Sequence, residues 1–239
     1  ISPAGLAGGG APPRPGEISL AHNGVLFLDE LPEFPRIAME VLRQPLEDGV
    51  ITISRSAGRA SFPCRFVLVA AMNPCPCGYF GHPTQPCRCS PSKRSVYLSK
   101  VSGPLLDRMD IHVEMPPVEY KELSATAPGE PSSLIRQRVE AARLLQRERY
   151  RELGIPCNGR LTPGALRRYC TLTPDAQRLL AMAYDRLGFS GRSYDRLLRI
   201  SRTIADLAGE EQINSDAMAE AVQYRSLDRK YWQPELGTL

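Results

Sequence analysis

Two continuous apolar runs in the first half of the chain predict strands of a parallel sheet. Val25–Leu28 leads directly into Asp29, and Phe66–Ala71 is followed closely by Asn73. Runs of this length without polar alternation are typical of strands that are buried on both faces. A third run, Ile111–Met115, ends at two prolines and predicts a further strand. Together these runs indicate an α/β domain.

The segments between these runs predict a helix and a hairpin. Pro35–Gly49 has apolar residues at helical spacing, with Pro45 expected to bend or end the helix early. The face expected to be buried carries Ile37, Val41, Leu42 and Leu46. Residues 50–55 and 60–62 flank a turn with Gly58, which predicts a β-hairpin with Arg55 and Arg59 near its tip.

The second half of the chain has the 3.6-residue periodicity of a helical bundle. Ser132 or Ser133 is expected to cap a long helix that runs to about Leu153. Four more helices are expected over Pro163–Cys170, Pro174–Leu187, Ser193–Ala208 and Ser215–Arg225. The sequence therefore predicts three parts: an α/β domain over 1–117, a linker over 118–133 and an all-α region over 134–239.

Composition and charge narrow the class of protein without fixing it. The chain has 239 residues, of which 42% are hydrophobic and 23% charged, as in ordinary globular proteins. No apolar run is long enough to span a membrane, so no membrane partner is expected. The net charge of +4 permits nucleic acid as a partner but does not require it. Seven cysteines, an odd number, favour metal binding in a reducing compartment such as the cytoplasm over a disulfide scaffold.

The acidic pair after the first predicted strand is the main candidate for chemistry. Asp29 and Glu30 would lie at the carboxyl end of a parallel strand, where open α/β sheets bind ligands. This is the arrangement of a Walker B strand, in which Asp29 would hold Mg²⁺ and Glu30 would polarise the attacking water. Asn73, at the end of the neighbouring strand, is placed to hold a water near a γ-phosphate. The alternative is a buried strand that simply exits into an acidic loop.

The glycine triplet Gly8–Gly10 does not predict a phosphate-binding loop. Such a loop needs the pattern G-x-x-x-x-G-K-[ST] with free backbone amides, and here Pro12 and Pro13 follow closely. No G-K-[ST] occurs anywhere in the chain. If the protein is an ATPase, its Walker A lysine is expected upstream of the sequence given.

Four of the cysteines are arranged as two close pairs. Cys75-Pro76-Cys77 and Cys87-Arg88-Cys89 are separated by a turn-rich spacer and can converge on one tetrahedral ion. We expect structural zinc, because four thiolates leave no open position for catalysis. His82 in the spacer could replace one cysteine, and the remaining alternative is four unligated thiols.

Two groups of arginines have both a functional and a structural interpretation. Arg108, flanked by Asp107 and Asp110, is either a surface ion-pair partner or an arginine finger that reaches the nucleotide of a neighbouring subunit. Residues 134–170 hold nine arginines against three glutamates. That run is either a solvated helical face or a nucleic-acid contact.

The order of these motifs resembles that of the magnesium-chelatase-like AAA+ ATPases of the YifB/ComM type. The resemblance rests on Pro15–Glu30, Ala70–Gly78, Ser102–Arg108 and Arg202–Leu207, and it covers essentially the whole chain. It implies a partial AAA+ αβα nucleotide-binding domain with an inserted β-hairpin, followed by a helical lid. The Walker A half and a Lon-protease-like domain of such proteins have no counterpart in the sequence given.

The resemblance also implies roles for individual residues. Asp29 and Glu30 match Walker B, Asn73 matches sensor 1, and Arg108 matches the arginine finger that acts in trans, which implies a ring, with a hexamer expected. Arg192 matches sensor 2, with Arg196 as the fallback one turn later. ATP and Mg²⁺ are the implied cofactors. Arg55 and Arg59 would point into the pore of the ring, where DNA phosphates pass.

Three functions follow as hypotheses. The first is an ATP-driven DNA motor, because the resemblance to ComM implies branch migration or helicase activity on single-stranded or branched DNA in natural transformation. The second is a magnesium-chelatase-type ATPase that remodels a protein partner and drives metal insertion into a porphyrin. The third is a binding or regulatory module, because the chain lacks Walker A.

Overall fold

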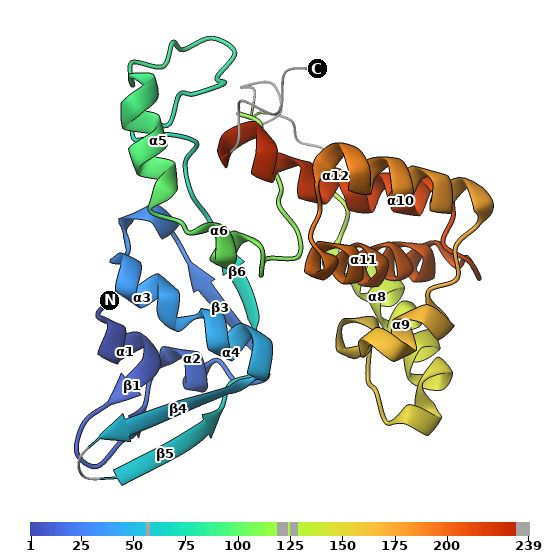
Figure 1. Ribbon diagram of the computed structural model, residues 1–239, viewed down its shortest axis with the longest axis horizontal. Coiled ribbons are helices and arrows are strands. Elements are labelled where there is room, and N and C mark those ends of the chain that lie inside the picture. The colour runs from blue at the N-terminus through green and yellow to red at the C-terminus, as the bar shows by residue number, and fades with distance from the viewer. Residues whose placement is uncertain (56–57, 119–123, 125–128, 233–239) are drawn as a thin grey trace. The chain divides into compact units, whose positions relative to one another are not determined.

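The computed structural model describes residues 1–55, 58–118, 124 and 129–232 (Figure 1). The chain divides into two compact units, Ile1–Met109 with the end of the chain from Asp228, and Asp110–Leu227. The first unit combines small sheets with short helices, and the second is helical. This confirms an α/β region with a parallel strand pair, followed by a helical C-terminal region. The αβα organisation of a complete AAA+ core stays a prediction.

The parallel pair consists of β3 (Val25–Leu28) and β6 (Val67–Ala70), with Leu28 opposite Ala70. Burial alternates along β3, because Leu26 and Leu28 lie in the core while Val25 and Phe27 are 61% and 59% exposed. The prediction of burial on both faces is therefore wrong for the described residues. Only one face of the pair packs on the core, and the other presents Val25, Phe27, Val67 and Val69 to solvent.

The predicted hairpin is confirmed as β4 (Val50–Arg55) and β5 (Gly58–Pro63), an antiparallel pair (Figure 1). Ile51 and Ile53 are buried, so one face of the hairpin is held against its own unit. Arg59 is exposed near the tip, opposite Ser54. The turn residues 56 and 57 and the side chain of Arg55 lie outside the described part of the structure.

The helix predicted over Pro35–Gly49 is divided into α3 (Arg36–Val41) and α4 (Arg43–Asp48). The break falls at Leu42, three residues before Pro45, because a proline prevents the hydrogen bond of its own amide and crowds the preceding turn. Gly49 closes α4 with φ 66°, in the left-handed region. The expected buried face was partly wrong. Ile37 is 72% exposed, and the side chains that reach the core are those of Ala38, Met39 and Leu42.

The remaining elements of the first unit are short. They are α1 (Pro3–Ala7), β1 (Gly8–Gly9), β2 (Arg14–Pro15), α2 (Glu17–Leu20), the 3₁₀ turn η1 (Leu31–Glu33), α5 (Pro91–Ser99) and α6 (Gly103–Leu106). β1 and β2 pair at close quarters, since a Cβ on Gly16 would lie 2.3 Å from the Gly8 nitrogen. The core of this unit gathers Leu6, Ile18, Leu26, Leu28, Leu31, Met39, Leu42 and Leu105.

The strand predicted over Ile111–Met115 is wrong. These residues form no strand in the structure, and Ile111, Val113 and Met115 are exposed. The backbone amide of His112 instead donates a hydrogen bond to the carbonyl of Tyr224 at 2.9 Å. The segment thus belongs to the second unit, where its backbone is hydrogen-bonded to a helix and not to the neighbouring strand that the apolar alternation predicts.

The second unit is a bundle whose helices lie close to the predicted bounds (Figure 1). Its elements are α8 (Ser132–Arg149), η2 (Arg151–Leu153), η3 (Asn158–Arg160), α9 (Pro163–Tyr169), α10 (Pro174–Leu187), α11 (Gly191–Ala208) and α12 (Ser215–Trp232). α8 ends at Arg149, four residues earlier than expected, and α12 continues to Trp232, seven residues beyond the expected end at Arg225. α11 packs against α8 and α9, and its Leu197, Leu198 and Ala205 are buried in the core. None of the described helices is both long and apolar enough to cross a bilayer.

Candidate active site and metal centre

The parallel register brings the sequence-predicted acids and Asn73 to one edge of the β3–β6 pair. Beyond the last paired residues, the Ala71 amide donates to the Leu28 carbonyl at 2.9 Å and the Leu31 amide donates to the Ala71 carbonyl at 3.0 Å. These bonds hold the loop after β3 against the segment after β6. Asp29, Glu30 and Asn73 are all exposed at this carboxyl edge, as the sequence predicted for neighbouring parallel strands.

Glu30 is held in an unusual backbone conformation. Its φ of 52° and ψ of 46° lie in the left-handed region, which costs a residue with a Cβ about 1–3 kcal/mol. The Glu30 amide is hydrogen-bonded to Asp29 Oδ1 at 2.9 Å, so the first carboxylate fixes the backbone of the second. Strained residues of this kind cluster at active sites, where the surrounding structure sets the direction of a side chain.

The hydroxyl of Tyr97, in α5, is hydrogen-bonded to the backbone of Asn73. The ring is only 7% exposed, and burial raises the pKa of its hydroxyl, with Glu33 and Glu30 adding to the rise. The backbone amide of Asn73 opposes this shift by hydrogen bonding to the Tyr97 oxygen. Because α5 begins immediately after Cys89, one helix reaches both the cysteine segment and the edge that carries Asn73.

Arg108 follows α6 and is engaged within its own unit. Its Nη2 lies 2.8 Å from Glu47 Oε1, its Nη1 donates to the Pro104 carbonyl at 2.7 Å, and its side chain is 8% exposed. The ion-pair interpretation from the sequence holds, with Glu47 as a partner, although the Arg108 side chain is largely buried rather than at the surface. The role of Arg108 as a finger in trans stays a prediction.

The two candidate sensor 2 arginines lie on the first turns of α11. Arg192 is exposed as the second helical residue after the N-cap Ser190. Arg196, one turn later, forms an ion pair with Asp110 and is 17% exposed. The shared helix places both on one face at i and i+4. Their roles toward a nucleotide stay predictions.

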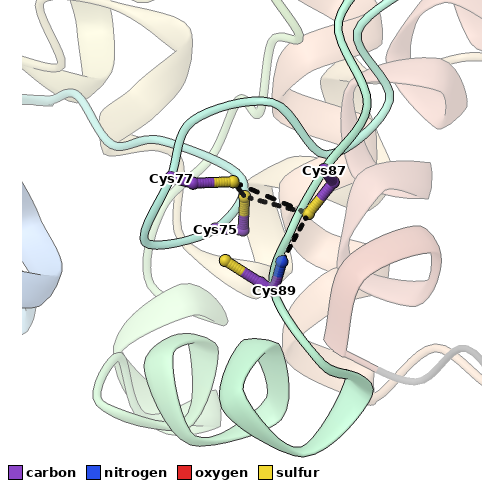
Figure 2. A group of neighbouring side chains, drawn as sticks. All are labelled: Cys75, Cys77, Cys87 and Cys89. Atoms are coloured by element: carbon purple, nitrogen blue, oxygen red, sulfur yellow. Dashed lines mark hydrogen bonds between the residues drawn. The ribbon is translucent and has the colours of Figure 1, made fainter.

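The four cysteines of the two pairs converge on one point. The Cys75 Sγ lies 3.4 Å from Cys77 Sγ and 3.7 Å from Cys87 Sγ, and Cys77 Sγ lies 3.7 Å from Cys87 Sγ. All four Sγ atoms, Cys89 included, lie within 4.8 Å of one another, and the side chains point inward from two chain segments (Figure 2). Zn–S bonds of about 2.3 Å require S···S edges of about 3.8 Å in a tetrahedron, so these distances fit a zinc ion.

Backbone amides donate hydrogen bonds to two of these sulfurs. Hydrogen bonds from the amides of Tyr79 and Arg88 lower the pKa of the Cys77 thiol to about 6. The amide of Cys89 donates to Cys87 Sγ at 3.4 Å. Burial raises the pKa of the Cys89 thiol to about 11. Without a bound cation, the protein therefore favours a thiolate at Cys77 and disfavours one at Cys89. Four thiolates at such distances require a bound cation, so the cluster is a candidate structural metal site for which zinc is the best-fitting ion.

Residues around the cysteines hold their loop in place. Arg94 Nη1 donates to the Cys89 carbonyl at 2.9 Å, and its guanidinium lies 4.3 Å from the centre of the Phe80 ring. His82 Nδ1 accepts hydrogen bonds from the amides of Thr84 and Gln85 at 3.2 and 3.1 Å. That nitrogen therefore supports the loop, and His82 does not take part in the cysteine cluster.

Sequence reasoning missed the supporting roles of Tyr97 and Arg94. The available signal was Ser90-Pro91, an N-cap followed by a favoured first helical residue directly after Cys89. That signal fixes the start of α5 at the cysteine cluster and places its first two turns beside the candidate edge.

Comparison with known proteins places the chain in one family. The family model described as magnesium chelatase, subunit ChlI matches residues 1–123, and the model of its C-terminal part matches residues 129–225. Competence protein ComM of Haemophilus influenzae is 47% identical over 225 residues, which is 94% of this chain and 43% of ComM. YifB of Escherichia coli is 45% identical over the same shares.

A protein of Mycobacterium bovis, Mb2921c, is 44% identical over 227 residues, which is 94% of this chain and 44% of that protein. The chain thus spans less than half the length of the curated relatives it matches. The two family models together cover the strand pair, the hairpin, the cysteine cluster and the helical bundle. The acidic edge, the four-cysteine cluster and these matches lead to one conclusion: the chain belongs to the magnesium chelatase subunit ChlI family.

Proposed function

We propose that the protein is an AAA+ ATPase that couples ATP hydrolysis to DNA remodelling. The observation that carries the ATPase part is the carboxyl edge of the β3–β6 pair, where Asp29, Glu30 and Asn73 meet. Phosphoryl transfer needs a hard cation, a positioned water and neutralised phosphate charge. Carboxylate and amide oxygens at one exposed edge can hold the cation and position the water. Membership of the ChlI family agrees with this chemistry.

Each edge residue has a separate task in this proposal. Asp29 holds Mg²⁺, directly or through water, because carboxylate oxygens are its preferred protein ligands. Glu30 orients and polarises the attacking water, and its left-handed backbone conformation is of the kind that clusters at active sites. The Asn73 amide holds the same water from the neighbouring strand. Arg192, with Arg196 as the alternative, supplies positive charge from the helical region.

The third need, charge neutralisation from a neighbour, falls to Arg108. An arginine supplied in trans contributes about 10³–10⁵ in rate and ties hydrolysis to a subunit interface. The Glu47 pair holds the Arg108 guanidinium within its own unit, so engagement with a neighbour would exchange Glu47 for phosphate. The working form is then a homo-oligomeric ring, for which a hexamer is expected. The domain division predicted from sequence, with its lid over 134–239, belongs to the same proposal.

DNA is the proposed substrate because of the hairpin arginines and the name of one relative. Arg59 is exposed beside the hairpin tip, and Arg55 lies opposite Gly58 at the end of β4. Two arginines near the tip of a hairpin supply positive charge of the kind that binds the phosphates of a DNA strand passing through a ring. One relative carries the name of a competence protein, which agrees with a role in natural transformation. Branch migration on single-stranded or branched DNA is the finer form of the proposal.

A magnesium-chelatase-type activity is the second candidate, and the name of the matching family favours it. In that case ATP hydrolysis would remodel a protein partner that inserts Mg²⁺ into a porphyrin. The hairpin arginines and the cysteine cluster have no evident task in that reaction.

The test compares what stimulates hydrolysis by the full-length protein. ATPase activity is measured alone, with branched DNA, and with a porphyrin in the presence of candidate partner subunits. The proposal predicts stimulation by branched DNA and none by porphyrin. Stimulation by porphyrin and partner alone would favour the chelatase function, and hydrolysis indifferent to both would reject DNA as the substrate.

A further inference from the structure

The loop between the two cysteine pairs presents an aromatic ring on a rigid support. Tyr79 is 41% exposed, and its ring packs edge-on against His82 with centroids 5.7 Å apart and planes at 78°. His82 is itself fixed by the amides of Thr84 and Gln85. The Tyr79 amide donates a hydrogen bond to the Cys77 sulfur, so the backbone next to the ring is held at the cysteine cluster. The ring therefore keeps one orientation while a large part of its surface remains open.

The same loop lies in a stretch of one-sided charge. No aspartate or glutamate occurs from residue 49 to residue 106, and the basic residues in that stretch are Arg55, Arg59, Arg65, Arg88, Lys93, Arg94 and Lys100. Arg88 and Lys93 are exposed on either side of Cys89. Arg94 is occupied by the Cys89 carbonyl and the Phe80 ring, where it offsets the −2 charge of a zinc ion with four thiolates. The exposed side chains of Arg88 and Lys93 are therefore available to bind an external anion.

We propose that this loop, residues 78–88 together with Lys93, is a second contact for single-stranded DNA. One unstacked base lies on the open surface of Tyr79, and the neighbouring phosphates contact Arg88 and Lys93. Exposed aromatic rings interleaved with positive charge are the physical requirement for binding single strands without sequence preference. Duplex DNA fits this surface poorly, because its bases are stacked and unavailable to Tyr79. The inference rests on the proposed function, since it assigns that motor a further DNA contact beyond the hairpin.

The position of the loop links the contact to hydrolysis. A Cβ on Gly78 would lie 3.9 Å from Asn73 Oδ1, so the start of the loop adjoins the side chain proposed to hold the water. Gly78 has φ 81°, which an L side chain rarely adopts. DNA bound on Tyr79 thus acts one residue away from Gly78, whose backbone adjoins the Asn73 side chain. By thermodynamic reciprocity, nucleotide at the edge then changes the affinity of the loop for DNA.

The experiment measures binding of a fluorescently labelled oligothymidylate to the full-length protein with a non-hydrolysable ATP analogue. Tyr79→Ala is expected to weaken binding about 5- to 100-fold, and Tyr79→Phe to restore it, because stacking needs the ring and not the hydroxyl. Removing Arg88 and Lys93 together is expected to lower the slope of log affinity against log salt by about 1.4. Photocrosslinking through 5-iodouracil is expected to label Tyr79.

Matched controls separate this contact from the fold and from the hairpin. Tyr184→Ala removes an equally exposed tyrosine, 39% against 41%, from α10 and is expected to leave binding unchanged. Zinc content of one ion per chain in every variant shows that the loop is intact. Unchanged affinity in Tyr79→Ala, while alanine at Arg55 and Arg59 still weakens binding, would overturn the loop contact alone. A wild-type protein that binds no DNA would overturn the proposed function as well.

Discussion

Leu28 of β3 and Ala70 of β6 are opposite one another at the last position of a parallel ladder. This pairing determines which residues can share chemistry, because whatever follows the two strands emerges at one edge. Asp29 and Glu30 follow Leu28, and Asn73 follows Ala70 after two residues. The bonds from Leu31 and Ala71 then close the edge into a fixed loop. The proposed hydrolysis by Asp29, Glu30 and Asn73 depends on this register.

The ring model predicts that two inactive variants restore activity when mixed. Glu30→Gln disables the site of its own subunit, whereas Arg108→Ala disables the site of the neighbour. Each alone is expected to lose hydrolysis, by about 10³–10⁵ for the arginine. In mixed rings, some interfaces join an intact Glu30 to an intact Arg108. Steady-state ATPase assays of mixtures should show recovered activity, and mixtures as inactive as the separate variants would contradict a finger in trans.

The metal centre predicts a specific pattern of cysteine substitutions. Cys87→Ser removes a ligand whose sulfur lies 3.7 Å from two others, so zinc is lost and the segment between β6 and α5 loses its support. Cys157→Ser is the control, because Cys157 lies outside the cluster. Metal analysis by mass spectrometry should give about one zinc per chain in the wild type and the control. Full zinc content in Cys87→Ser would contradict a four-cysteine site.

The edge and the cysteine cluster were predictable from sequence, because both depend on local pattern. A continuous apolar run followed by acids, and two Cys-x-Cys pairs across a turn-rich spacer, each carry their chemistry in a few adjacent residues. The helix bounds of the second unit followed from caps such as Thr162-Pro163 and Thr173-Pro174, whose threonine hydroxyls accept the expected amide hydrogen bonds.

The errors came from features that depend on distant partners. Nothing in the run Val25–Leu28 indicates that only one face would be covered, because burial of the second face depends on elements elsewhere. Residues 111–115 alternate between apolar and polar side chains, as a strand does. The backbone amide of His112 nevertheless donates its hydrogen bond to the carbonyl of Tyr224, which lies in a helix. The ion pair between Arg108 and Glu47 joins residues 61 positions apart, which local charge pattern does not reveal.

The hairpin arginines are predicted to set the DNA affinity. Alanine at both Arg55 and Arg59 removes two phosphate contacts, so affinity falls and the salt slope decreases by about 0.7 for each contact on single strands. Circular dichroism should be unchanged, because Arg59 is exposed and Arg55 is the last residue of β4. Alanine at Arg178 and Arg186, both exposed on α10, is the control. Equal affinity and equal salt slope for the two double variants would reject the hairpin as a DNA contact.

A buried charge network in the second unit predicts a large stability effect. Asp206 accepts hydrogen bonds from Arg149 at 2.7 and 3.0 Å, from Arg202 at 3.0 Å and from Asn158 at 2.8 Å. Arg202, 1% exposed, also donates to the carbonyls of Glu210 and Glu211. Asp206→Ala leaves two arginines without their carboxylate, and such losses cost about 3–5 kcal/mol in the free energy of unfolding.

The control for that prediction is Asp175→Ala, which removes the exposed ion pair with Arg178. Exposed pairs contribute little, so a change within about 1 kcal/mol is expected. Denaturant unfolding of the intact protein, followed by circular dichroism, measures both variants. Equal losses for the buried and the exposed aspartate would show that the network does not stabilise the bundle.

In the proposed mechanism, Glu30 activates water for DNA-dependent ATP hydrolysis. ATP turnover by full-length wild type and Glu30→Gln, each with and without branched DNA, together with ATP binding, tests this role. Glu30→Gln is expected to bind ATP and DNA as the wild type does but to lose DNA-stimulated turnover. Turnover that survives the substitution would contradict the role of Glu30 and the site at the β3–β6 edge.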